Sequence, residues 1–144
     1  MAVAFNNVDG TKKAASWIEK GLTPEAITFA EAFGKELTGR KGKSSYRGPF
    51  EALTTSQIRN IFGEVRRIEM KGYDERALLM LKPRLMYAVQ RNPTAGSKDF
   101  QRVITTALDA VFAGATAEQK ADRFRNFADF FEAILAYHRA YGGK

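Results

Sequence analysis

Residues 78–91 read LLMLKPRLMYAVQR, and this stretch decides how the middle of the chain folds. It is apolar enough for a helix that must be buried on one side. It also carries one proline and three cations, namely Pro83, Lys82, Arg84 and Arg91. Because proline lacks an N–H and clashes with the carbonyl four residues back, we expect a kink or split near Leu81. Long cations can keep their heads in water while their stems pack. With no acidic residue in the stretch, they predict an unneutralised positive face that needs either solvent or a polyanion.

Outward from this stretch, apolar residues recur at helical spacing. The pattern predicts helices near residues 11–20, 24–37, 54–71, 74–92, 97–114 and 117–141. Their starts carry capping signals: Thr23 before Pro24, Thr54 with Gln57, the acidic pair Asp74 and Glu75, Ser97 and Thr116. Gly142 and Gly143 provide a stop for the last helix.

The apolar stripes predict which residues form the core. The second helix has Ile27, Ala30, Phe33 and Leu37; the third has Ile58, Ile61, Phe62, Val65 and Ile68; the fifth has Phe100, Val103, Ile104, Ala107, Leu108 and Val111; the last has Phe124, Phe127, Phe131, Ile134, His138 and Tyr141. No segment alternates like a strand. The sequence therefore predicts an all-α fold, a compact bundle of five or six helices forming one domain over residues 1–144, with a basic loop at 38–49.

Composition excludes several classes of protein. A hydrophobic content of 44% with 12% aromatic residues is not that of a disordered chain. We expect no membrane partner, because no apolar run approaches the roughly 18 residues of a span, and no secretory signal, because the N-terminus lacks a charged region before an apolar one. The absence of cysteine removes disulfides and thiolate sites, and fits a cytoplasmic protein.

The charge indicates what the protein binds rather than how it folds. The formal net charge is +7, shared almost evenly between residues 1–72 (+4) and 73–144 (+3). The charge thus belongs to the body of the chain and not to a tail. Nucleic acid is the commonest partner for such a chain, followed by acidic proteins and membranes.

Nothing in the sequence favours catalysis. The single histidine, His138, lies on the aromatic stripe of the last helix, where a packed or hydrogen-bonded role is the expected one. No metalloprotease, nucleophile-elbow or phosphate-loop motif occurs. We therefore predict a protein that is not an enzyme, with no metal, cofactor or small-molecule substrate.

Three groups of basic residues support a polyanion partner. They are Arg40, Lys41, Lys43 and Arg47 in the loop, Arg59, Arg66 and Arg67 on the third helix, and Lys82, Arg84 and Arg91 on the fourth, with Lys98 and Arg102 extending the last group. Each could equally be a solvated face. Tyr46, Tyr87 and Tyr141 could stack on bases, although a core or interface role is the safer prediction for the last two. No base-reading motif occurs, so contacts to a nucleic-acid backbone are favoured.

Three blocks of sequence resemble a known family. LTTSQIRNIF at 53–62, KPRLMYAVQR at 82–91 and FEAILAYHRAYGGK at 131–144 together resemble the small α-helical subunit of the type III-A CRISPR (Csm) effector complex. The order of the blocks and their distance from the C-terminus carry the resemblance. Two positions depart from the family pattern: Gln90 stands where many relatives have glycine, and Pro83 where a helix former is expected.

The resemblance implies a non-catalytic helical bundle that stacks in several copies beside the other Csm subunits and lines the channel for guide RNA and target RNA. It implies RNA contacts from Ser56, Arg59, Lys82 and Arg91, support of the helix by Tyr87, and packing or subunit contacts from Tyr137, Tyr141 and the final glycines. Adding cations from the charge pattern, the candidate RNA-binding residues are Lys41, Lys43, Arg47, Ser56, Arg59, Arg66, Lys82, Arg84 and Arg91. Two other hypotheses stay open: a helical DNA-binding or architectural regulator, and a protein–protein scaffold that docks through an exposed Phe124 and Phe131.

Overall fold

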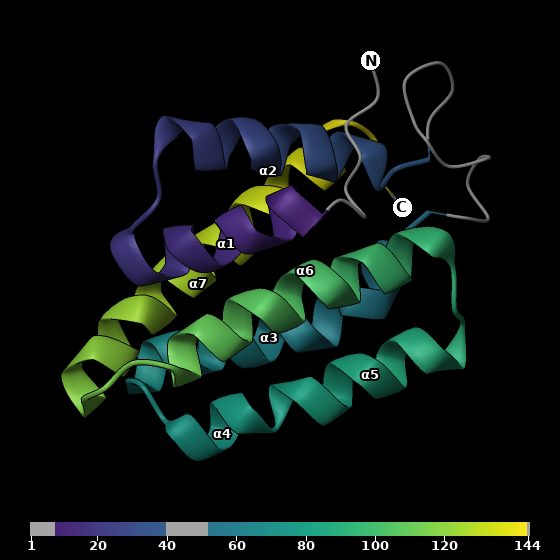
Figure 1. Cartoon of the computed structure of the whole chain (residues 1–144). Coiled ribbons are helices and arrows are strands. Elements are labelled where there is room, and N and C mark those ends of the chain that lie inside the picture. Colours follow the sequence, from purple (N-terminus) through teal and green to yellow (C-terminus); the bar gives the residue numbers. More distant parts are fainter. Residues whose placement is uncertain (1–7, 40–51, 144) are drawn as a thin grey trace.

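The computed structural model describes residues 8–39 and 52–143, without the side chains of residues 8–11 and 57. Most of the predicted basic loop therefore lies outside the described residues. The helices are α1 (Val8–Lys20), α2 (Pro24–Glu36), α3 (Thr55–Lys71), α4 (Glu75–Leu79), α5 (Leu81–Arg91), α6 (Ala95–Phe112) and α7 (Ala117–Ala140). The described part of the chain contains no strand, and the predicted all-α fold is confirmed (Figure 1).

The predicted fourth helix is split in two, as Pro83 required. α4 ends at Leu79 and α5 begins at Leu81, with Met80 between them as the cap of both. The split puts Pro83 in the first turn of α5. The N–H groups of a first turn have no partner within their helix, so a missing one costs little there. The proline that would break a continuous helix is thereby compatible with a new one.

α7 is the central helix of the bundle. It packs most extensively against α2 and also contacts α1, α3 and α6. α6 in turn lies between α1 and α5, and α5 packs against α3 and α6. Figure 1 shows α1 and α2 in the upper half of the molecule and α3 to α6 in the lower half, with α7 running from one half to the other.

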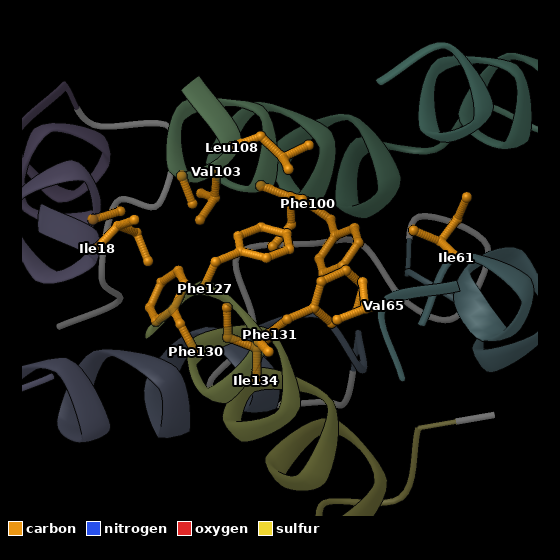
Figure 2. Close-up of a cluster of buried hydrophobic side chains, with 14 of the residues drawn as sticks. Ile18, Ile61, Val65, Phe100, Val103, Leu108, Phe127, Phe130, Phe131 and Ile134 are labelled. Carbon is orange, nitrogen blue, oxygen red and sulfur yellow. The ribbon is translucent and has the colours of Figure 1, made fainter. Parts of the chain in front are cut away.

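The aromatic residues of α7 form the centre of the core (Figure 2). The Phe131 ring lies 5.4 Å from the ring of Phe62, 5.4 Å from that of Phe100 and 5.9 Å from that of Phe127, measured between centroids. The contacts with Phe100 and Phe127 are edge-to-face, a geometry that aromatic quadrupoles favour. The predicted stripe from Phe124 to His138 is buried as expected.

Three details of the core prediction are wrong. Ile27 is 40% exposed, and its neighbour Ala26 is buried instead. Phe130, absent from the predicted stripe, is buried with its ring 5.9 Å from that of Trp17. Phe130 lies on a second apolar side of α7, which α1 and α2 cover. Tyr141 is only half-buried, at the end of the stripe.

The capping predictions are confirmed at three helix starts and wrong at one. Thr23, Asp74 and Thr116 each accept a hydrogen bond from the backbone N–H three residues on. α6 begins two residues before the predicted Ser97, because Thr94 is its cap: Thr94 Oγ1 accepts from Ser97 N at 3.0 Å, and Ser97 Oγ accepts from Thr94 N at 2.9 Å. The predicted pairing of Thr54 with Gln57 depends on the side chain of Gln57, which is outside the described part of the structure.

His138 is a packed, hydrogen-bonded residue, as predicted. It is fully buried, and its Nε2 donates to the Leu53 carbonyl at 2.8 Å, since a carbonyl can only accept. Its Nδ1 has no partner among the described residues. Burial lowers the pKa of His138 below its usual 6.5. The fold therefore favours the neutral ring.

This pKa predicts a pH dependence of stability. Because the folded pKa lies below the unfolded one, the contribution of His138 is complete above about pH 6.5 and is lost as the pH falls. His138→Gln keeps a donor near Leu53 but does not titrate. In urea unfolding at about pH 7.5 and pH 5.5, the wild type should lose more unfolding free energy than the variant. Equal losses would contradict this assignment.

Gly34 predicts a second stability effect, at the contact of α2 with α7. A Cβ there would lie 2.8 Å from His138 N, Ile134 O and the Tyr137 Cβ, and two of these atoms are backbone. Gly34→Ala should therefore destabilise the protein by about 1–3 kcal/mol. Gly63→Ala in α3 is the matched control, since nothing lies within 4 Å of its new Cβ. It should be neutral or stabilising by up to about 1 kcal/mol. The measurement is urea unfolding, and the same sign for both variants would refute the argument.

Candidate nucleic-acid interface

A groove of about 810 Å³ lies between α3 and α5 on the molecular surface. Ile61 from α3 lines its floor, and the buried Leu85 holds α5 against the core. The polar residues along the groove include Ser56, Asn60, Glu64, Arg84, Tyr87 and Arg91. The first three are spaced by four along α3, and the last three by three and four along α5. Each set therefore shares one helix face. We call this the α3–α5 groove.

A second, smaller groove of about 200 Å³ lies between α3 and α7. Arg59 and Arg139 line it together with Phe62, Leu135 and Ala136. Arg66, on the same face of α3 as Arg59, bonds to Glu132 of α7 at 3.3 Å. Arg59 and Arg66, seven residues apart on α3, thus point toward α7 and away from the α3–α5 groove.

The candidate RNA-binding residues of α3 and α5 therefore occupy three surfaces. Ser56, Arg84 and Arg91 meet in the α3–α5 groove. Arg59 and Arg66 lie along α7. Lys82 lies on the opposite side of α5, where its Nζ bonds to Asp109 of α6 at 2.6 Å. The structure brings together only part of the predicted set.

The prediction that the cations of residues 78–91 are unneutralised is wrong for two of the three. Arg84 lies 3.1 Å from Glu64, and Lys82 is paired with Asp109. Both acids come from other helices, so the absence of acidic residues within the stretch gave no sign of them. The hydrogen bond from Arg67 lowers the pKa of the Glu64 carboxyl, and the charge of Arg84 adds to this effect. Such exposed pairs contribute little to stability.

Arg59 and Arg91 differ from these residues, because neither forms an ion pair within the described ranges. The Arg91 guanidinium lies over the ring of Tyr87, 5.8 Å from its centroid. Tyr87 itself is 67% exposed, so a core role for it is wrong. Tyr141 instead donates a hydrogen bond to Glu31 at 2.6 Å, with Lys35 over its ring.

Several expected contacts cannot be placed, and several lining residues were missed. Lys41, Lys43, Arg47 and Tyr46 lie outside the described residues. Lys98 and Arg102 lie on α6, where Arg102 pairs with Asp99. Sequence reasoning missed Asn60, Asn92 and Arg139. Asn60 could have been found from its four-residue spacing to Ser56; Arg139 required the packing of α7 against α3.

Comparison with known proteins places the chain in a family. The sequence model of the Csm2 Type III-A family matches residues 25–144. The chain belongs to this family. It is accordingly a small helical subunit of the multisubunit type III-A Csm complex, from a family with a structural role in that complex. No curated protein and no solved structure matches it. Within the described ranges, none of the helices combines the length and apolar character that a membrane crossing requires.

The exposure of Tyr87 and Arg91 predicts that the fold does not depend on them. Tyr87→Ala and Arg91→Ala should each change the unfolding free energy by at most about 0.5 kcal/mol. The control is Leu85→Ala on the same helix, which removes a buried side chain and should cost about 2–5 kcal/mol. Urea unfolding of the three variants is the measurement. A loss above about 1 kcal/mol for either surface variant would mean that the fold requires the residue.

Proposed function

We propose that this Csm2 family member is a non-catalytic RNA-binding subunit that works in the cytoplasm. It lines the guide RNA and target RNA channel of its complex, beside other Csm subunits and further copies of itself. The observation that supports the proposal most is the meeting of Ser56, Arg84 and Arg91 in the α3–α5 groove. Family membership indicates the complex in which the protein works, and the groove is the surface that would contact RNA.

The mechanism is electrostatic. Arg91 is exposed and holds no carboxylate among the described residues, so its guanidinium can bind a phosphate through two parallel hydrogen bonds. Arg84 is half exposed and already bonds to Glu64. A guanidinium has five donors, so Arg84 can keep this bond and still face a phosphate. The two arginines, two turns apart on α5, can follow a nucleic-acid backbone without reading its sequence.

The remaining candidates take secondary positions in this proposal. Arg59 is unpaired in the part of the chain that the structure describes, and it would contact a phosphate beyond the α3–α5 groove. Lys82 and Arg66 are already bonded to Asp109 and Glu132, away from the α3–α5 groove, so each would share its charge between a carboxylate and a phosphate. We therefore expect Arg91 to contribute most to RNA binding and Lys82 least among the cations of α5.

The structure counts against the scaffold hypothesis in the form stated above. That hypothesis requires an exposed aromatic stripe, but Phe124 and Phe131 are only 2% and 0% exposed. Both belong to the core cluster, in which Figure 2 shows Phe131. The hypothesis of a DNA-binding regulator is tested by the nucleic acid that the protein prefers.

The proposal predicts a salt-dependent weakening of binding when the groove arginines are removed. The double variant Arg84→Ala/Arg91→Ala should bind single-stranded RNA more weakly than the wild type. Its slope of log affinity against log salt should be shallower by about 0.7–0.9 for each phosphate that is no longer neutralised. The measurement is fluorescence anisotropy at several salt concentrations, repeated with the assembled complex, because one subunit offers only part of a shared channel.

Arg125→Ala is the matched control. Arg125 lies on α7, is 72% exposed and pairs with Asp122 of its own helix. The substitution removes the same kind of charge away from both grooves, so its salt slope should equal that of the wild type. If the α5 and α7 variants weakened RNA binding equally, the loss would reflect the net charge of the protein alone. That result would overturn the proposed site. A preference for duplex DNA would instead support the regulator.

A further inference from the structure

The electrostatic mechanism leaves the apolar and amide side chains of the α3–α5 groove without a role. The described ranges contain six exposed large apolar residues. Four of them lie on α4, α5 and the break between them, namely Leu79, Met80, Met86 and Tyr87. Met80 and Tyr87 line the α3–α5 groove. Backbone phosphates offer nothing that these side chains can pack against.

Tyr87 is the most informative of these residues. It is 67% exposed, and its hydroxyl has no hydrogen-bond partner within the described part of the chain. One side of its ring is approached by the Arg91 guanidinium at 5.8 Å. A flat ring beside a flat cation is the pair of groups on which nucleobases stack. The cation of the same pair can reach the phosphate of the stacked nucleotide.

The facing wall of the groove offers groups that suit the edge of a base. Asn60 on α3 is exposed, and its amide makes no hydrogen bond to any described residue. An amide carries donors and an acceptor together, which matches the mixed edge of a base. The hydroxyl of Ser56 lies one turn away on the same face. The groove thus places a stacking ring opposite polar groups that can bind a base edge.

The ring and the cation of the groove favour an unpaired nucleotide over a paired duplex or an apolar protein segment. A paired duplex keeps its base faces inside the stack, so it would leave Tyr87 unused. An apolar protein segment would bury the charge of Arg91 without a partner, which is unfavourable. An unpaired nucleotide satisfies the ring, the amide and the cation at once.

We infer that the α3–α5 groove binds an unpaired nucleotide, with its base stacked on Tyr87, its edge facing Asn60 and its phosphate on Arg91. This inference rests on the proposed RNA binding and adds to it the class of RNA element that is bound. It changes the expected selectivity, because the groove then distinguishes unpaired from paired RNA.

The test compares two short single-stranded RNAs of the same length. One is intact, and the other is abasic at its central nucleotides. Binding of the full chain is measured by fluorescence anisotropy. For the wild type, removing the bases should weaken binding by roughly 5- to 150-fold, the range that stacking of a single base on Tyr87 supplies. Tyr87→Leu should weaken binding of the intact RNA by a similar factor and leave binding of the abasic RNA unchanged. Tyr87→Phe keeps the ring and should bind like the wild type.

Met86→Ala is the matched control, because it removes an exposed apolar side chain of α5 that does not line the groove. It should bind both RNAs like the wild type. The inference is overturned if Tyr87→Leu has no effect, affects both RNAs equally, or is matched by Met86→Ala. It is also overturned if Tyr87→Leu blocks assembly of the complex while RNA binding persists, since the groove would then hold a protein.

These failures can be told apart from failure of the proposed function. Equal affinity for intact and abasic RNA, with a salt slope that still depends on Arg84 and Arg91, refutes the stacking site alone. A salt slope that does not depend on the two arginines refutes the RNA-binding site itself.

Discussion

The buried hydrogen bond from His138 to the Leu53 carbonyl is the contact on which the position of the α3–α5 groove depends. Leu53 also donates its N–H to the carbonyl of Leu37 at 3.0 Å, so one residue joins the ends of α2 and α7 just before α3 begins. The chain end closes this arrangement, because Gly143 N donates to His138 O at 2.8 Å, and a Cβ at Gly143 would lie 2.1–2.4 Å from the ring. With the start of α3 fixed, its row of Ser56, Asn60 and Glu64 is fixed as well.

The bundle separates stability from the proposed recognition. α7 buries its aromatic side chains against four helices, while α5 packs mainly against α3, α4 and α6 among the described helices. α5 therefore packs along one stripe, Leu81, Leu85 and Val89, and its remaining faces stay available. The break at Met80 places Pro83 in the first turn of α5, where its missing N–H costs little. Arg84, Tyr87 and Arg91 then share the face toward α3, and Lys82 the face toward α6.

Most of the fold follows from local rules that the sequence displays. Helical periods, the caps at Thr23, Asp74 and Thr116, and the proline break all act within a few residues, so they can be predicted from neighbours in the chain. The errors arise where tertiary packing decides. Phe130 is buried because α1 and α2 cover a second side of α7. The cap at Thr94 is an exception, because it is a local feature in a segment whose proline and glycine indicate a loop. Ion pairing is the clearest case of an error caused by tertiary packing. Glu64 is 20 residues from Arg84 in the sequence, and Asp109 is 27 residues from Lys82.

These ion pairs change what the net charge of +7 means for the protein. A face of free cations binds any polyanion, because counterion release does not depend on shape. Here Lys82 and Arg66 are already held by carboxylates, and Arg84 shares Glu64 with Arg67. Among the candidate cations of α3 and α5, those left without an acid in the described ranges, Arg59 and Arg91, each line a groove. Pairing within the fold therefore concentrates the available positive charge of these two helices at hollowed positions, where the shape of the ligand and its unpaired bases can contribute to selectivity.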